Sequence, residues 1–119
     1  MSDLDALARR LEQFAVARDW AQFHNPKNLA MALAGEVGEL VAEFQWLTPD
    51  QAATVMTDDA EAAARIRAEL GDVTNYFVRL ADVVGVDLVE AAHAKIDAND
   101  KRYPADTYRG SARKAPGHH

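Results

Sequence analysis

Apolar side chains recur at steps of three and four residues along most of this chain, a period typical of α-helices. No segment alternates with period two for long enough to predict a strand, so the expected fold class is all-α. Start and stop signals support the helices, such as the capping pair Ser2 and Asp5 and the stop at Gly85. The expected helices cover residues 2–18, 28–46, a short segment from 48, 58–84 and 87–102.

Two short acidic motifs stand inside the two longest expected helices. Glu36 and Glu39 form the first motif, and Glu69 and Asp72 form the second. A spacing of three places both acids of a motif on one helical face, while each helix is otherwise apolar nearly all round. Such helices are normally buried, and each buried carboxylate costs several kcal/mol unless it is compensated. A bound cation is the simplest compensation for four acids.

Glycines beside these acids add to this interpretation, because a glycine inside a helix costs roughly 0.5 to 1 kcal/mol relative to alanine. They suggest the close approach of another backbone or of a ligand, and they are Gly35, Gly38 and Gly71. The alternative is that the acids form a solvated face, which is the ordinary meaning of a single motif of this kind. The repetition of the motif favours a metal site.

The ligand types indicate which cation would bind. Clusters of carboxylate oxygens suit hard ions such as Mg²⁺, Mn²⁺ or Ca²⁺. Zinc would require histidine or cysteine ligands, and the chain has no cysteine. A di-iron site in a helical bundle would require Glu-x-x-His motifs, whereas both motifs here end in an acid.

Length and composition predict one domain at residues 1–107, followed by a mobile tail at 108–119. The 119 residues are 49% apolar with a net charge of −6, which argues against a nucleic-acid polymer as partner. No apolar run reaches membrane-spanning length and no secretory leader is expected. The absence of cysteine favours a cytoplasmic location. The terminal His118 and His119 are assigned no metal.

Several side chains outside the acidic motifs could hold a substrate. Trp20, His24 and Trp46 lie at loops or helix ends, where an aromatic ring can stack on a base. Lys95 and Asn99 stand one helical turn apart, where they could bind phosphate or a sugar hydroxyl. The alternatives are that the aromatic residues serve packing and that the charged residues interact with their own helix dipole.

Taken together, these segments resemble the MazG-like nucleoside triphosphate pyrophosphohydrolases, and most closely their dCTP pyrophosphatase subgroup. The resemblance extends over about residues 11–114. It rests on four ordered motifs: the two acidic pairs with Gly35-Glu-Val-Gly-Glu-Leu40, the run Asp19-Trp20-x-x-Phe23-His24-x-Pro26-x-Asn28-Leu29, Phe44-Gln45-Trp46, and Lys95-Ile-Asp-x-Asn99-x-x-Arg102-Tyr103-Pro104.

This resemblance implies an all-α, four-helix-bundle-type subunit that assembles into a homo-oligomer, either a tetramer or a dimer of dimers. It also implies Mg²⁺-dependent cleavage of a (deoxy)nucleoside triphosphate, such as dCTP or a modified dCTP, to the monophosphate and pyrophosphate, with Mn²⁺ as a substitute ion. The residues concerned are Glu36, Glu39, Glu69 and Asp72 for the metal and catalysis, Trp20, His24, Trp46 and Tyr76 for the base and sugar, and Lys95, Asn99 and Tyr103 for the phosphates.

Some alternatives stay open at this point. Leu11 stands where the dCTP subgroup tends to carry a histidine, which leaves the base preference open. A relative within the same superfamily that acts on dUTP or phosphoribosyl-ATP is one alternative. A non-catalytic helical module that binds a nucleotide or a metal is another. The sequence does not decide whether water attacks the α or the β phosphorus.

Overall fold

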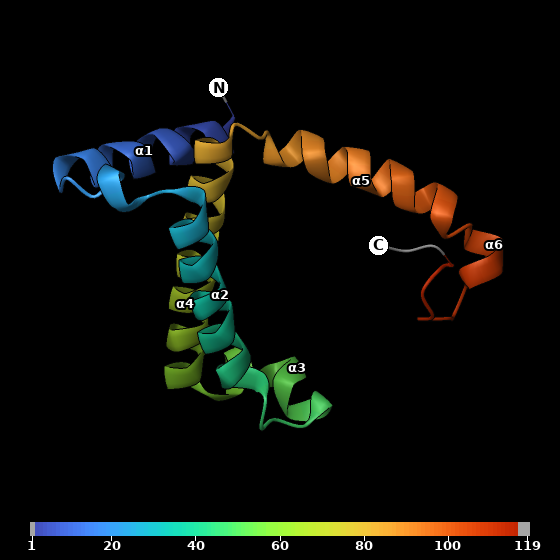
Figure 1. Cartoon of the computed structure of the whole chain (residues 1–119). Coiled ribbons are helices and arrows are strands. Elements are labelled where there is room, and N and C mark those ends of the chain that lie inside the picture. Colours follow the sequence, from blue (N-terminus) through green and yellow to red (C-terminus); the bar gives the residue numbers. More distant parts are fainter. Residues whose placement is uncertain (1, 117–119) are drawn as a thin grey trace. The chain divides into compact units, whose positions relative to one another are not determined.

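A computed structural model describes residues 2–116 of the chain, and within that range it contains helices and no strand (Figure 1). The all-α expectation is therefore confirmed for the described residues. The helices are α1 (Asp3–Ala17), the 3-10 helix η1 (Ala21–Phe23), α2 (Pro26–Phe44), α3 (Pro49–Asp58), α4 (Ala60–Val84), α5 (Leu88–Arg102) and α6 (Ala105–Tyr108). None of these helices is long and apolar enough to cross a membrane.

The chain divides between Gly85 and Val86 into two compact units. The first unit holds α1 to α4, and the second holds α5, α6 and the segment that follows. The expected domain boundary at residue 107 stays a prediction. His118 and His119 lie outside the described residues.

Capping side chains define most helix starts as the sequence predicts. Ser2 and Asp5 form a reciprocal capping box at α1, and Thr48 and Gln51 form another at α3. Gly85 adopts a φ of 75° at the end of α4, in the left-handed region that favours glycine. These local hydrogen bonds fix the helix boundaries without help from tertiary contacts.

The structure differs from the sequence prediction at the start of one helix and in two short additional helices. Helix α2 begins at Pro26 rather than at Asn28, because Asn25 is the cap and its side chain accepts a hydrogen bond from the Asn28 backbone N–H at 2.9 Å. A proline is favourable at the first helical position, where its missing N–H costs nothing. The segment expected to be a loop also contains η1, and the short α6 after Pro104 was not predicted.

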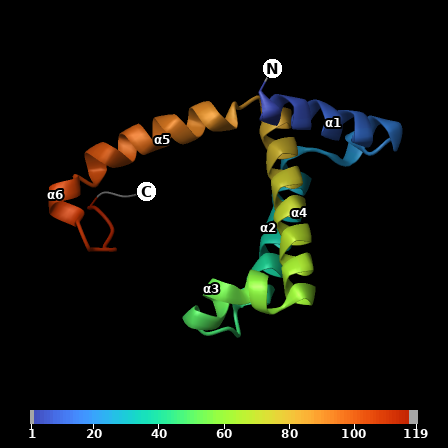
Figure 2. The same cartoon turned by 180° about the vertical axis from the view of Figure 1, so that it is seen from behind.

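Helices α2 and α4 lie side by side along most of their length in both views of the molecule (Figures 1 and 2). At one end of this pair, a core of Val55, Ala62 and Ile66 packs against side chains from α2 and the turn that follows it. Helix α1 contacts α4 elsewhere, with Ala8 and Ala15 buried. The α2–α4 pairing brings the two acidic motifs together.

Within the single chain, α2 and α4 are not buried on all sides, although each is apolar nearly all round. Leu29 is the one buried residue of α2, whereas Met31 is 64% exposed and Val41 is 52% exposed. A Cβ atom built on Gly38 or on Gly71 would meet nothing within 4 Å. The close approach that the glycines suggested is therefore not made within this chain, and one apolar face of each helix is left open.

Candidate active site

Three of the four motif acids converge where α2 faces α4. Glu36 comes from α2, and Glu69 and Asp72 come from successive turns of α4. Each offers a carboxylate oxygen, and these three oxygens all lie within 4.8 Å of one another. The helix spacing in the sequence predicts the two pairs, and the α2–α4 packing joins them into one cluster.

Among the described residues, 2–116, two carboxylate oxygens of the cluster have no compensating partner. One oxygen of Glu36 and one of Glu69 are buried without a hydrogen-bond partner. The Glu36 carboxyl group, close enough to share a proton with Glu69, is the largest cause that raises the pKa of Glu69 to about 7; desolvation and Glu39 add to the effect. Buried acceptors without partners are costly, so this arrangement calls for a donor or a cation.

The fourth acid, Glu39, is exposed and does not belong to the group of three. It is nevertheless near enough for its carboxylate to contribute to the raised pKa of Glu69. The next acid along α2, Glu43, is paired instead with Arg65 of α4, whose Nε lies 3.0 Å from a carboxylate oxygen. On this face of α2, Glu43 is therefore neutralised by an ion pair, whereas Glu36 has an unpartnered oxygen.

The donor set fits a hard divalent ion. The three converging ligands are all carboxylates, and no histidine is among them. Oxygen ligands of this kind favour Mg²⁺, Mn²⁺ or Ca²⁺ over zinc. The two unpartnered oxygens are where an ion would replace the missing hydrogen-bond donors.

A cavity of about 210 Å³ opens beside the acid cluster and shares Asp72 with it. Three of the four residues predicted to bind base and sugar line this cavity: Trp20, His24 and Tyr76. The complete lining is Leu11, Phe14, Trp20, His24, Asp72, Asn75, Tyr76 and Arg79. Trp46 is not part of this lining and is 85% exposed, so its role stays a prediction.

Aromatic and basic side chains shape the walls of this cavity. Trp20 packs edge-on against Phe14, with ring centroids 5.7 Å apart, and the Arg18 guanidinium lies over the Phe14 ring. The Nε of Arg79 donates a hydrogen bond to Nδ1 of His24 at 3.1 Å. These contacts hold flat apolar surface next to a carboxylate of the acid cluster, an arrangement that suits a planar ligand beside a bound cation.

Sequence reasoning did not single out Phe14, Asn75 and Arg79 as members of the site. For two of them a signal was present. Asn75 and Arg79 follow Asp72 at steps of three and seven, so they share its face of α4. Leu11 also lines the cavity, which places the position that departs from the dCTP subgroup against the candidate nucleoside site.

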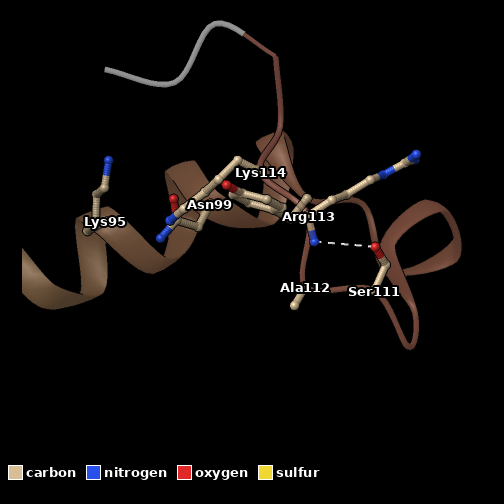
Figure 3. Close-up of a pocket in the computed structure, with 7 residues that line it drawn as sticks. Lys95, Asn99, Ser111, Ala112, Arg113 and Lys114 are labelled. Atoms are coloured by element: carbon tan, nitrogen blue, oxygen red, sulfur yellow. Dashed lines mark hydrogen bonds between the residues drawn. The ribbon is translucent and has the colours of Figure 1, made fainter.

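The second unit contains a separate cavity of about 270 Å³ (Figure 3). It brings together Lys95, Asn99 and Tyr103, the three residues expected near phosphates, which recur every four residues on α5 and just beyond it. The segment 111–114 completes the wall, with Arg113 and Lys114 as further cations. The Ala115 N–H donates to the Tyr103 hydroxyl oxygen at 3.2 Å and holds this segment in place.

Comparison with known proteins places these features in a family. The MazG-like family matches residues 32–115. The chain is 46% identical to human dCTP pyrophosphatase 1 and 44% identical to that of Bos taurus, in each case over 111 residues. These residues are 93% of this chain and 65% of each relative, so the chain spans slightly less than two thirds of their length.

A solved structure agrees with this assignment. A pyrophosphatase from Archaeoglobus fulgidus DSM 4304 is 31% identical and superimposes with a TM-score of 0.79, covering 87% of this chain and 94% of that one. The range matched by the MazG-like family, residues 32–115, includes both acidic motifs. It also includes the residues that line the second cavity, from Lys95 to Lys114. The resemblance found in the sequence is thus confirmed, and the chain belongs to the MazG-like family.

Proposed function

We propose that this chain hydrolyses a (deoxy)nucleoside triphosphate, dCTP or a modified dCTP, to the monophosphate and pyrophosphate, with Mg²⁺ as cofactor and Mn²⁺ as a substitute. The observation that carries the proposal is the cluster of Glu36, Glu69 and Asp72, with two unpartnered buried oxygens beside an aromatic cavity. The similarity to dCTP pyrophosphatase 1 supports the choice of substrate.

In this proposal the four motif acids hold the cofactor. The chemistry that a bound ion supplies is neutralisation of phosphate charge and activation of water for in-line attack. Glu39 lies outside the group of three and is exposed, so its carboxylate is the one with a free oxygen that could also orient the attacking water. No side chain needs to become covalently bound to the substrate.

The remaining residues bind and orient the nucleotide. Trp20, His24 and Tyr76 receive the base and sugar, since all three line the cavity beside Asp72. Lys95, Asn99 and Tyr103 receive phosphates, and the cations Arg113 and Lys114 in the same cavity support that role. Trp46 is assigned to the base as well, on the strength of the sequence motif alone.

Product analysis over a panel of nucleotides tests the proposed function. The panel consists of dCTP, 5-methyl-dCTP, dTTP, dUTP and phosphoribosyl-ATP, each incubated with the protein and Mg²⁺ and with EDTA as control. We expect stoichiometric monophosphate and pyrophosphate from a cytosine nucleotide, and none with EDTA. Binding without release of pyrophosphate would instead identify a non-catalytic module, and a preference for dUTP or phosphoribosyl-ATP would identify the alternative relatives.

Truncation of Trp20 to alanine should raise the KM for the nucleotide roughly tenfold to a hundredfold, with kcat less affected. Loss of one stacking contact removes about 1 to 3 kcal/mol, and stacking stabilises ground and transition states alike. The same change is expected for Trp46→Ala. Steady-state kinetics measure it, with Phe23→Ala as the control, because Phe23 is an exposed aromatic of the same segment that does not line the cavity.

Two outcomes would contradict this role for Trp20. A large fall in kcat at unchanged KM would place the indole in aligning the phosphates. Unaltered kinetics with a lowered melting temperature would show that it only packs against Phe14.

We also propose that the chain is a cytoplasmic, four-helix-bundle-type subunit of a homo-oligomer, a tetramer or a dimer of dimers. Support comes from an apolar stripe on α2, called here the α2 stripe, which recurs at steps of three and four and is exposed at every position: Met31, Ala34, Gly38 and Val41. Helix α4 has a matching exposed series at steps of seven: Leu70, Phe77 and Val84. Such repeats are typical of helices that pack against other helices.

A further inference from the structure

The ring of His24 is held in one tautomer by a neighbour that can only donate. Arg79 Nε lies 3.1 Å from His24 Nδ1 with hydrogen-bonding geometry. A guanidinium group has no acceptor, so Nδ1 must be the unprotonated nitrogen of the ring. In neutral imidazole the proton then resides on Nε2. The nitrogen left for a ligand in the cavity is therefore a donor.

Arg79 is itself fixed by its surroundings. It is only 8% exposed, which is rare for an arginine. Its Nη1 lies 3.7 Å from one carboxylate oxygen of Asp82, and Arg9 of α1 binds the other oxygen of Asp82 at 2.6 Å. The guanidinium is thus held between a carboxylate on one side and His24 on the other, with little freedom to turn away.

The charge state of His24 agrees with this geometry. Burial, and secondarily the positive charge of Arg79, lower the pKa of His24 from its usual value. The titratable groups that line the same cavity are Asp72 and Tyr76, while Asp82 and Arg9 lie behind Arg79. His24 is therefore neutral at pH 7, as the acceptor role of Nδ1 requires.

We propose that Arg79 is a specificity-determining positioning residue, which fixes His24 as the Nε2–H tautomer so that the cavity presents a permanent hydrogen-bond donor to the base. This inference rests on the proposed function. A permanent donor that faces position 3 of a pyrimidine matches cytosine, whose N3 is an acceptor. It opposes uracil or thymine, which carry an N–H at that position and would leave two donors facing each other.

Arg79 and His24 come from α4 and from the turn after η1, and they meet 55 positions apart in the sequence. The contact is therefore a product of tertiary packing and not of a local motif. Leu11 lines the same cavity and has no polar group, so the neutral polar groups that can meet a base there belong to His24, Asn75, Trp20 and Tyr76. The Asn75 amide can donate or accept a hydrogen bond, so it does not distinguish one base from another unless a neighbour fixes its orientation.

Nuclear magnetic resonance of the full chain with ¹⁵N-labelled histidine tests the tautomer without any substrate. The chain has four histidines, and the His24 signals are assigned by their loss in His24→Gln. We expect wild-type His24 to show a protonated Nε2 and an unprotonated Nδ1, and Arg79→Lys, which keeps a donor, to behave in the same way. Arg79→Met should give a mixture of tautomers and a higher titration midpoint. A wild-type ring protonated at Nδ1 would overturn the inference, whatever the variants do.

Kinetics test the consequence for specificity. The ratio of kcat/KM for dCTP to that for dUTP should fall about tenfold in Arg79→Met, mainly through a raised KM for dCTP, and should be retained in Arg79→Lys. Arg65→Met is the matched control, because it removes an arginine from the same helix outside the cavity and should leave the ratio unchanged.

A double substitution separates positioning from structural support. Phenylalanine at position 24 keeps a flat ring but has no nitrogen for Arg79 to hold and no donor to offer the base. In the His24→Phe background, Arg79→Met should therefore change the ratio little. An equal fall in both backgrounds, or an unchanged ratio and tautomer in Arg79→Met, would overturn the inference. Absence of turnover by the wild-type chain would instead contradict the proposed function, while the tautomer measurement would still stand.

Discussion

Replacement of Asp72 by asparagine, or of Glu39 by glutamine, is expected to reduce pyrophosphate release to background while leaving the helical fold intact. The loss should be roughly a hundredfold or more, the scale seen when one preorganised electrostatic group is removed from an active site. The same variants should be as stable as the wild type without metal, or more stable. Each removes a negative charge from the cluster or from beside it, where Glu36 and Glu69 already carry unpartnered buried oxygens.

Activity and stability should therefore move in opposite directions in these variants. Thermal melting in EDTA measures the metal-free stability, and melting over a Mg²⁺ series measures the stabilisation that binding adds by mass action. We expect Mg²⁺ to raise the melting temperature of the wild type more than that of Asp72→Asn. This contrast separates loss of the metal from loss of the fold.

Glu43→Gln is the matched control for the acidic cluster. Glu43 lies one turn beyond Glu39 on α2, but its carboxylate is paired with Arg65 and is not part of the cluster. The exposed ion pair contributes little to stability, so both activity and melting temperature should stay near those of the wild type. Hydrolysis near the wild-type rate in Asp72→Asn or Glu39→Gln would refute the assignment of the metal site.

The local parts of this structure could be predicted from the sequence because they depend on neighbours three and four residues away. The capping boxes of α1 and α3 and the left-handed Gly85 follow from side chains that bond their own helix ends. The pairing of acids within each motif follows from helical geometry alone. Convergence of the two motifs was expected because the same acidic pair occurs twice, which favours one shared metal site.

Features that depend on distant contacts could not be predicted in this way. The hydrogen bond from Arg79 to His24 joins residues 55 positions apart, and no local sequence pattern around either residue predicts it. The segment 111–114 lines a cavity together with Lys95 and Asn99, and the Ala115 N–H next to it donates to the Tyr103 hydroxyl oxygen. In each case residues that share a site are brought together by contacts beyond their own helical turn.

Apolar periodicity also predicted more burial than one chain provides. The period identifies which residues avoid water but does not say whether the covering surface comes from the same chain. On α2 the side that carries Leu29 is covered by the chain itself, whereas the side that carries Met31 and Val41 is exposed. The sequence was therefore informative about the need for a partner surface, and the structure identifies the face concerned.

A glutamate placed on the α2 stripe, at Met31 or at Val41, is expected to break the wild-type assembly into smaller species. Wild-type protein at micromolar concentration should have the mass of a tetramer in analytical ultracentrifugation, because an apolar face of this kind is unfavourable in water. A charge buried in such an interface would cost several kcal/mol per ion, which is enough to dissociate a symmetric assembly that repeats it in every subunit.

The control is Gln13→Glu, which adds the same charge at an exposed polar position of α1 and should leave the mass unchanged. A stable wild-type monomer would contradict the prediction, and so would a tetramer that tolerates glutamate at both Met31 and Val41. Since Gly38 lies between these two positions with open space where a Cβ would be, the stripe has room for the backbone of a second helix to approach closely.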